Sequence, residues 1–266
     1  MSEALKSKIE VPVMSDVFAA GKKPEYLFWV GCAGAFDNRY MKVAKAFATI
    51  LNHLGTDYAV LGKEESCTGD PARRAGNEML YQMQAMTNIE LFKMYEIKKI
   101  ITICTHCYNI LKNEYPDLGA EFEVVNYLDF IVQMIKEGKL KTDNSKTKGI
   151  KVTYHDPCYL GRANDIYESP RFIIQSLGLE FAEMKRNKSF ALCCGAGGAQ
   201  MFKDAEKGDK EIFIERTEEA LETNPEVIAT ACPFCMTMMT DGLKYKNKEE
   251  EIKNLDIAEI IAEALI

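Results

Sequence analysis

The chain has 266 residues, of which 47% are hydrophobic and 27% are charged. This apolar content suffices for a complete core and excludes a largely disordered protein, while the net charge of −7 argues against binding nucleic acid or anionic membranes. No apolar run approaches the roughly 20 residues that cross a bilayer. The N-terminal sequence MSEALKSKIEVPVM lacks the apolar core of a secretory signal, so we expect a cytoplasmic location, free or attached to the cytoplasmic face of a membrane complex.

Short β-branched runs alternate with helical patterns along the first part of the chain. An N-terminal extension over residues 1–24 is followed by an expected first half over 25–137. Within this half the patterns predict strands over 26–30, 57–61 and 98–103, and helices over 39–53, 74–95 and 130–138.

The same order of elements is expected again after a polar linker over residues 138–150, in a second half over 151–266. There the patterns predict strands over 151–155, 179–184 and 226–230, and helices over 170–177 and 208–222. Such alternation is typical of parallel sheets covered by helices. The predicted fold is an α/β protein of two pseudo-repeated halves, each a small parallel sheet with flanking helices.

The nine cysteines form two copies of one pattern. Cys32 and Cys158 are 126 residues apart, as are Cys67 and Cys193, whereas Cys104 and Cys107 precede Cys232 and Cys235 by 128, and Cys194 adjoins Cys193. In both halves the cysteines follow the carboxyl ends of predicted strands, the edge at which open parallel sheets bind ligands. Core cysteines that serve only packing would not keep this register, so the thiols share one function that occurs twice.

Several kinds of chemistry use many cysteines, and the spacing discriminates among them. An odd cysteine count without a secretory signal disfavours a disulfide framework. Structural zinc favours CxxC pairs about 15–20 residues apart, but ICTHC and ACPFC are separated by 125 residues. A thioredoxin-like pair would leave the other cysteines unexplained. Iron–sulfur ligation agrees best because soft thiolates select such clusters, and zinc stays as the alternative.

In spacing and local sequence, the pattern resembles the CCG-domain family of iron–sulfur proteins. The motif runs from one cysteine through Cys-Cys-Gly to CxxC, with HDPCYLGR, LCCGAGGAQM and ACPFCMTMM in the second half. It occurs twice in the cysteine-rich subunit of heterodisulfide reductase and in related iron–sulfur subunits of glycolate and lactate oxidation systems. The first-half sequence ESCTGDPARRAGNE resembles a bacterial branch found beside ferredoxin and membrane-cytochrome segments.

This resemblance implies a cofactor and its ligands. The complete second-half motif would bind a non-cubane [4Fe-4S] cluster through Cys158, Cys193, Cys194, Cys232 and Cys235. The cluster-bound pair Cys193 and Cys194 is the candidate catalytic group. Thr68 stands where the second half has Cys194, so the first half retains four thiolates: Cys32, Cys67, Cys104 and Cys107. Four thiolates could hold a second [4Fe-4S] cluster, an altered cluster or none. The substitution argues against symmetric cleavage of a disulfide between two clusters.

Residues beside the cysteines are candidates for binding the cofactor. Glycines would let the backbone approach a bulky cluster and donate N–H groups to its sulfurs, and prolines would shape the cluster loops. The candidates are Gly69, Gly195, Gly197, Gly198, Pro157 and Pro233. His106 and His155 also lie near cysteines, and for both we favour structural hydrogen bonding over tuning of a cluster sulfur.

The expected function is electron transfer as part of an oxidoreductase. As a heterodisulfide-reductase-like protein, the chain would exchange electrons with a disulfide or another small substrate at the five-cysteine cluster. The sequence contains no ferredoxin cysteine run and no flavin or nicotinamide fingerprint, so a ferredoxin-type or flavin subunit, or a membrane redox complex, is the expected partner. Two alternatives stay open: an electron relay in a membrane quinone or 2-hydroxyacid oxidation complex, and a zinc-stabilised assembly protein without redox activity.

Overall fold

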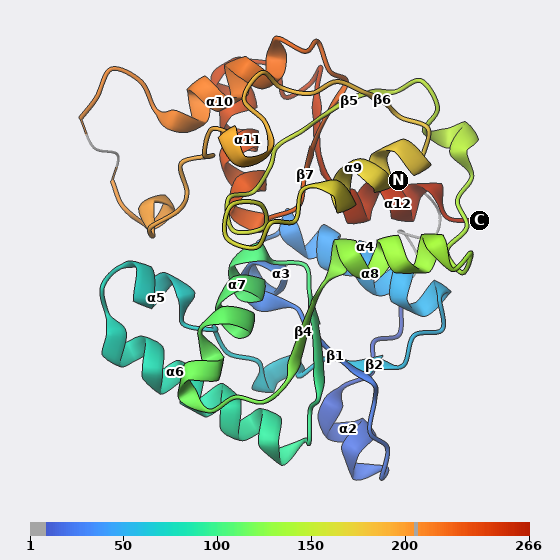
Figure 1. The fold of residues 1–266 in the computed structure, drawn as a ribbon, viewed down its shortest axis with the longest axis vertical. Helices are drawn as coiled ribbons and strands as arrows, with labels where there is room; N and C mark the ends of the chain where they lie inside the picture. Colours follow the sequence, from blue (N-terminus) through green and yellow to red (C-terminus); the bar gives the residue numbers. More distant parts are fainter. Residues whose placement is uncertain (1–8, 205–206) are drawn as a thin grey trace. The chain divides into compact units, whose positions relative to one another are not determined.

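The computed structural model describes residues 9–204 and 207–266. The chain divides into two compact units, Met1–Leu140 and Lys141–Ile266. Each unit contains a four-stranded, all-parallel sheet flanked by helices (Figure 1). The predicted α/β class with two pseudo-repeated halves is therefore confirmed.

The first unit orders its strands as β2-β1-β3-β4. The strands are β1 (Tyr26–Trp29), β2 (Tyr58–Ala59), β3 (Lys99–Thr102) and β4 (Glu123–Asn126). The α-helices are α2 (Met14–Ala19), α3 (Gly31–Phe36), α4 (Tyr40–His53), α5 (Asp70–Arg74), α6 (Glu78–Met94), α7 (Thr105–Asn113) and α8 (Tyr127–Lys136).

Successive residues of β1 point to opposite faces of the first sheet, as the two-residue period of a strand requires. Phe28 packs edge-on against Phe47 of α4, and Phe47 in turn contacts Phe130 of α8. Trp29 packs against Phe92 of α6, within a buried cluster that also contains side chains of α7. Helices α4 and α8 therefore cover one face, and α6 and α7 cover the other (Figure 1).

The strands that follow β1 in the chain are added first on one side of it and then on the other. The chain places β2 on one side of β1 and then returns to place β3 on the other, so β1 and β3 meet at a topological switch point. In doubly wound sheets, ligands bind at the carboxyl ends of such strands. Trp29 pairs with Thr102 at this end, and Cys32 and Cys104 follow within three residues. The topology therefore brings these two cysteines to one edge.

The second unit repeats this arrangement with the order β6-β5-β7-β8. Its strands are β5 (Lys151–Tyr154), β6 (Glu180–Phe181), β7 (Val227–Thr230) and β8 (Lys253–Asp256). Its α-helices are α9 (Glu168–Ser176), α10 (Ile212–Leu221), α11 (Pro233–Tyr245) and α12 (Ile257–Ala264). Cys158 follows β5 and Cys232 follows β7, so the second switch point also carries cysteines. Ile228 of β7 packs with Ala220 of α10 and Met239 of α11, so these helices cover one face of the sheet.

The helix predicted over residues 74–95 is confirmed from Glu78 onward, but its predicted start is wrong. Helix α5 ends at Arg74, and α6 begins at Glu78. Between them Gly76 has φ +88°, outside the helical region, and Asn77 caps α6 by accepting the N–H of Leu80. The helical pattern of the sequence does not reveal which glycine adopts a positive φ.

Other boundaries differ less. Strands β4 and β8 are not among the predicted elements, and α10 begins only at Ile212. Within residues 138–150, Asn144 donates to the carbonyl of Ser176, and Thr147 donates to the carbonyl of Leu177, so this part of the segment packs on the second unit. Among the described residues, none of the helices has both the length and the apolar character needed to cross a membrane.

Candidate metal centres

The four thiols of the first unit gather at the carboxyl edge of its sheet. Cys32 lies in the first turn of α3, Cys67 lies in the loop before α5, and Cys104 caps α7, whose first turn carries Cys107. Cys32 contacts Cys67, and Cys104 contacts Cys107. The two pairs are close enough for a charge on a thiolate of one pair to raise the pKa of a thiol in the other. Hydrogen bonds from the Cys32 thiol and the backbone N–H of Gly69 lower the pKa of Cys67 to about 6, so Cys67 is held toward its thiolate form.

Thr68 occupies the position of the missing fifth thiol. Its buried hydroxyl donates to Cys67, which helps to stabilise the thiolate. Its carbonyl accepts the hydroxyl of Tyr115 at 2.9 Å. Asn88 donates to that same hydroxyl at 3.0 Å and to the carbonyl of Cys67 at 3.1 Å. Thr68 therefore stabilises the sulfur of Cys67, and Tyr115 and Asn88 fix the backbone of both residues.

A carboxylate of the same loop holds the start of α3. Glu65 accepts the backbone N–H of Val30 at 3.1 Å and that of Gly31 at 2.5 Å, immediately before Cys32. Burial raises the pKa of Glu65 to about 7, although the two N–H groups act in the opposite direction. The loop that carries Cys67 is thereby tied to the helix that carries Cys32.

An ion-pair network lies beside the Cys104–Cys107 turn. The buried carboxylate of Asp70 lies 2.8 Å from Nδ1 of His106 and accepts Nε of Arg74 at 3.1 Å. Arg74 and Arg73 both bind Glu114. His106 thus has a structural hydrogen bond, which agrees with the interpretation favoured from the sequence. The arginine pair is engaged by carboxylates of the protein itself.

The five thiols of the second unit form one continuous row. In order of contact they are Cys158, Cys193, Cys194, Cys235 and Cys232. Hydrogen bonds from Cys158 and Cys194 hold the pKa of Cys193 far below its ordinary value, and the N–H of Gly195 contributes at 3.3 Å. Cys193 corresponds in the repeat to Cys67, so both units stabilise a thiolate at the same position.

The second row of thiols has apolar surroundings. Phe234 and Ala196 stand where the first unit has His106 and Asp70. Both belong to a buried cluster with the thiols, and Met201 and Met238 pack against it. The two centres therefore differ in the polarity of these neighbouring side chains as well as in thiol number.

The predicted glycines occupy different environments. Gly69 and Gly195 have φ values of +87° and +92°, and each donates its N–H to the cysteine two residues earlier. A Cβ on Gly69 would lie 2.9 Å from the ring of Tyr81, so glycine is required there on two grounds. Gly198 also has a positive φ, of +66°, whereas a Cβ on Gly197 would meet nothing within 4 Å. A role for Gly197 and Gly198 at a cluster stays a prediction.

The two prolines shape the backbone on either side of the second row. Pro233 is the first residue of α11, where a missing N–H breaks no helical bond and the ring fixes a helical φ. Pro157 begins the turn that carries Cys158, and its carbonyl accepts the N–H groups of Leu160 and Gly161. Both prolines act through backbone geometry, and their contact with a cofactor stays a prediction.

His155 reaches the thiols from the end of β5. A ring nitrogen of His155 and the Sγ atoms of Cys194 and Cys235 lie within 4.8 Å of one another. Arg216 donates Nε–H to Nδ1 of His155 at 2.9 Å. A histidine that binds a metal normally donates its other ring N–H to an acceptor, but here that nitrogen faces a guanidinium. His155 is therefore unsuited to complete a zinc site with the two thiols.

A buried charge pair fixes the strand end beside Cys158. Asp156 accepts both terminal nitrogens of Arg171, at 2.8 and 2.9 Å, and the backbone N–H of Lys188 at 2.8 Å. Arg171 also binds Glu183 at 2.6 Å. Sequence reasoning missed this clamp, although Asp156 lies within HDPCYLGR. The partner arginine comes from α9, and no local motif identifies it.

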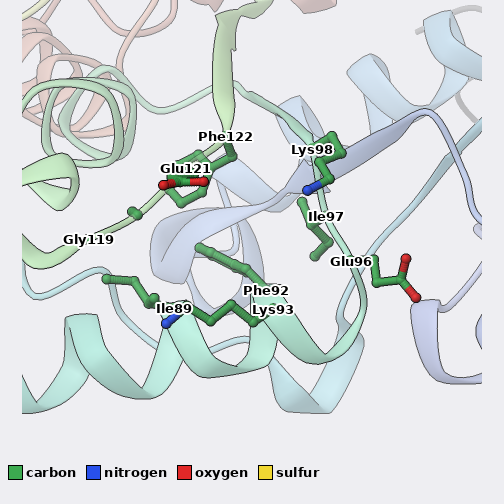
Figure 2. A pocket seen from close by; sticks show the side chains of 10 residues that line it. Ile89, Phe92, Lys93, Glu96, Ile97, Lys98, Gly119, Glu121 and Phe122 are labelled. Atoms are coloured by element: carbon green, nitrogen blue, oxygen red, sulfur yellow. The ribbon is translucent and has the colours of Figure 1, made fainter.

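Two pockets differ in their relation to the thiols. One, of about 410 Å³, lies between α6 and the segment before β4 (Figure 2), at the amino ends of β3 and β4 and thus at the edge opposite the cysteines. The other, of about 810 Å³, lies beside the Cys-Cys-Gly loop and is lined by Gly195, Met201, Phe213 and Met238, among other residues. Only the second of these pockets adjoins a thiol row.

The donor sets suit an anionic, sulfur-rich metal group. Thiolates are soft ligands, five in one row exceed the needs of tetrahedral zinc, and Cys193 is strongly biased toward the thiolate form. Buried ring nitrogens of Trp29 and His155, without hydrogen-bond partners among the described residues, add donors suited to an anion. The structure thus gathers each predicted cysteine set within its own unit, while ligation itself stays a prediction.

Comparisons with known proteins identify relatives of both units. The sequence model of the cysteine-rich domain CCG matches residues 26–112 and 152–240. The chain is 44% identical over 258 residues to the probable iron-sulfur-binding oxidoreductase FadF of Bacillus subtilis, covering 97% of this chain and 36% of that protein. It is 45% identical over 251 residues to EtfAB:quinone oxidoreductase of Syntrophomonas wolfei, covering 92% and 35%.

A third relative is a reductase subunit. The chain is 34% identical over 256 residues to one subunit of the dihydromethanophenazine:CoB--CoM heterodisulfide reductase of Methanosarcina barkeri, covering 91% of this chain and 59% of that protein. In all three comparisons nearly the whole chain matches, whereas it spans between 35% and 59% of the relative.

Proposed function

Because the chain belongs to the CCG cysteine-rich domain family, as the sequence predicts, we propose that it is the iron–sulfur redox part of an oxidoreductase. The observation that carries this proposal is the continuous row of five thiols at the second switch point: Cys158, Cys193, Cys194, Cys235 and Cys232. These thiolates would hold a [4Fe-4S] cluster of the non-cubane kind, and such a cluster supplies one-electron transfer when bound. The relatives named as iron-sulfur-binding or as oxidoreductases support this reading.

The residues of the chain prepare this site for an anionic group. Cys193 is held toward its thiolate form, and the N–H of Gly195 points at its sulfur. Phe234 and Met238 belong to the apolar surroundings and limit water near the sulfurs. Low local polarity strengthens every N–H···S hydrogen bond. The reduction potential of the cluster would therefore depend on the N–H donors that the protein fixes around it.

We infer that the first unit holds a second cluster through four thiolates: Cys32, Cys67, Cys104 and Cys107. Four thiolates are the ordinary ligand set of a cubane. Thr68 donates to Cys67 and adds no fifth sulfur. The two centres would therefore differ in kind, which argues against cleavage of a substrate between two equal centres.

The pocket beside Gly195 supports exchange of electrons with a small substrate, a disulfide or another molecule, at the second centre. The similarity to the heterodisulfide reductase of Methanosarcina barkeri supports the disulfide version. All nine cysteines are assigned to the two sets, so electrons would come from a partner, a ferredoxin-type or flavin subunit of a larger redox complex. The similarity to EtfAB:quinone oxidoreductase favours a second version, in which the centres relay electrons within a quinone-linked complex.

Metal analysis of the anaerobically purified chain tests the proposal, with EPR spectra after oxidation and reduction. We expect near eight irons per chain, because two four-iron centres are proposed. Cys194→Ala should alter only the second-centre signal. Thr68→Cys is the matched variant, because it adds a fifth thiol to the first unit. It should make the EPR signal of the first centre more like that of the second centre. Stoichiometric zinc without iron would refute the proposal.

The same samples separate the two versions of the function. Exposure to small thiols and disulfides should perturb the second-centre spectrum if a substrate reaches the iron, and the perturbation should disappear in Cys194→Ala. A spectrum that stays unchanged at millimolar thiol would favour the relay.

A further inference from the structure

Trp29 and His155 occupy the same position in the two halves. They are separated by 126 residues, the step that relates Cys32 to Cys158. Trp29 is the last residue of β1, and His155 follows the last residue of β5. Both side chains are fully buried, and in the part of the chain that the structure describes neither Nε1 of Trp29 nor Nε2 of His155 has a hydrogen-bond partner. Buried polar atoms are almost always paired, so two equivalent exceptions require an explanation.

The indole nitrogen of Trp29 faces the first thiol set. A Cβ built on Gly31 would lie 3.4 Å from Sγ of Cys107, 3.8 Å from Cβ of Cys104 and 4.0 Å from Nε1 of Trp29. The indole N–H, Cys104 and Cys107 therefore surround the same small space. This space is open because Gly31 has no side chain. An indole nitrogen can only donate a hydrogen bond, so this space is suited to an acceptor.

The imidazole of His155 presents an N–H to the second set. Arg216 has no acceptor atom, so the hydrogen bond of 2.9 Å from its Nε makes Nδ1 of His155 the acceptor. The single ring proton is then on Nε2, and the ring is neutral. Arg216 is fixed by the carbonyl of Arg186 at 2.8 Å and by Glu219 at 3.0 Å.

We propose that Trp29 Nε1–H and His155 Nε2–H are hydrogen-bond donors to the sulfurs of the first and second centres, and that each donor raises the reduction potential of its centre. This inference rests on the proposed iron–sulfur function. Reduction adds negative charge to the sulfurs, so a fixed N–H stabilises the reduced state more than the oxidised state. The buried cation of Arg216 behind His155 acts in the same direction.

Replacements that remove only the N–H test the proposal in the reconstituted full chain. Trp29→Phe keeps an aromatic ring. His155→Asn keeps an acceptor near Nδ1 for Arg216 but places no donor at Nε2, whereas His155→Gln places a donor near Nε2. Tyr154→Phe is the control, because it removes a buried hydroxyl that likewise has no hydrogen-bond partner among the described residues. The ring of Tyr154 lies beneath the guanidinium of Arg171.

Potentiometric titration followed by EPR gives the readout. We expect Trp29→Phe to lower the potential of the first centre alone, and His155→Asn that of the second alone. The expected change is roughly tenfold in the ratio of reduced to oxidised centre at fixed potential, about 59 mV for one electron. His155→Gln and Tyr154→Phe should stay near wild type. Unchanged potentials at unchanged iron content would overturn the proposal.

A labelling experiment keeps the proposal testable if a variant loses iron. Trp29 is the only tryptophan of the chain, so ¹⁵N-tryptophan labels one indole nitrogen. Pulsed EPR of the wild-type paramagnetic first centre should show a hyperfine coupling to this ¹⁵N nucleus and to an exchangeable proton. Absence of both couplings in an iron-loaded chain would refute the Trp29 donor, whereas absence of iron in the wild type would refute the proposed function itself.

Discussion

Replacement of Arg171 by leucine tests how the fold holds the second centre. Arg171 is 4% exposed, and its guanidinium makes a bidentate hydrogen bond to Asp156. Asp156 is 3% exposed and lies two residues before Cys158. Leucine fills part of the space but removes all donors. Asp156 would keep the N–H of Lys188 as its remaining bond among those described above.

The magnitude follows from the burial of the pair. Removing one partner of a buried ion pair leaves an uncompensated charge and costs about 3–5 kcal/mol of unfolding free energy. Glu183 contributes little to this figure, because its side chain is 35% exposed and water can replace the arginine. Adding Asp156→Asn should recover a large part of the loss in Arg171→Leu, because the buried charge is then gone.

Urea unfolding of the metal-free chain measures the total change, and amide hydrogen exchange locates it. We expect Arg171→Leu to reduce protection in β5 and β7 and to reduce iron retention at the second centre after reconstitution. Lys210→Met is the matched control, because it breaks an ion pair with Glu218 at the surface and should change stability by no more than about 0.5 kcal/mol. A loss below about 1 kcal/mol in Arg171→Leu, or full stability of that variant with an intact second centre, would contradict the reasoning.

Two further predictions concern packing and pH. A Cβ on Gly242 would lie 1.9 Å from Oγ1 and 2.8 Å from Cβ of Thr217. Gly242→Ala should therefore lower the unfolding free energy, measured in urea, by about 1–3 kcal/mol. Adding Thr217→Ala to this variant should restore only part of the loss. The pKa of Glu65 is raised to about 7 in the folded chain. Between the ordinary pKa of a glutamate and pH 7, the folded chain therefore binds more protons than the unfolded chain. Stability of the metal-free protein should therefore fall as pH rises through this window, by up to about 3 kcal/mol, and Glu65→Gln should flatten the slope. An equally steep slope in Glu65→Gln would assign the pH dependence to another group.

Much of the candidate site can be predicted from the sequence. The repeat places Cys32, Cys67, Cys104 and Cys107 in register with the second-half cysteines, and β-branched runs before them indicate strand ends. Parallel strands joined by helices present their carboxyl ends at one edge, so linear order suffices to bring these thiols together. The absence of a fifth thiol at Thr68 is equally visible in the sequence.

Short-range backbone detail is less predictable. The break between α5 and α6 depends on the positive φ of Gly76, and other glycines with positive φ occur in the same half. Periodicity identifies the apolar face of a helix but not the residue at which the chain turns.

Tertiary structure alone decides the polar environment of each centre. Arg216 lies 61 residues from His155, and Glu114 lies 40 residues from Arg74, yet each pair is in direct contact. Hydrogen bonds of this kind depend on side-chain direction and on the packing of helices against a sheet, which no local pattern encodes. The sequence by itself determined which thiols the chain offers and at which edge they gather. The tertiary structure decided which N–H groups and charges face them, because those partners come from distant segments that meet only when the core is packed.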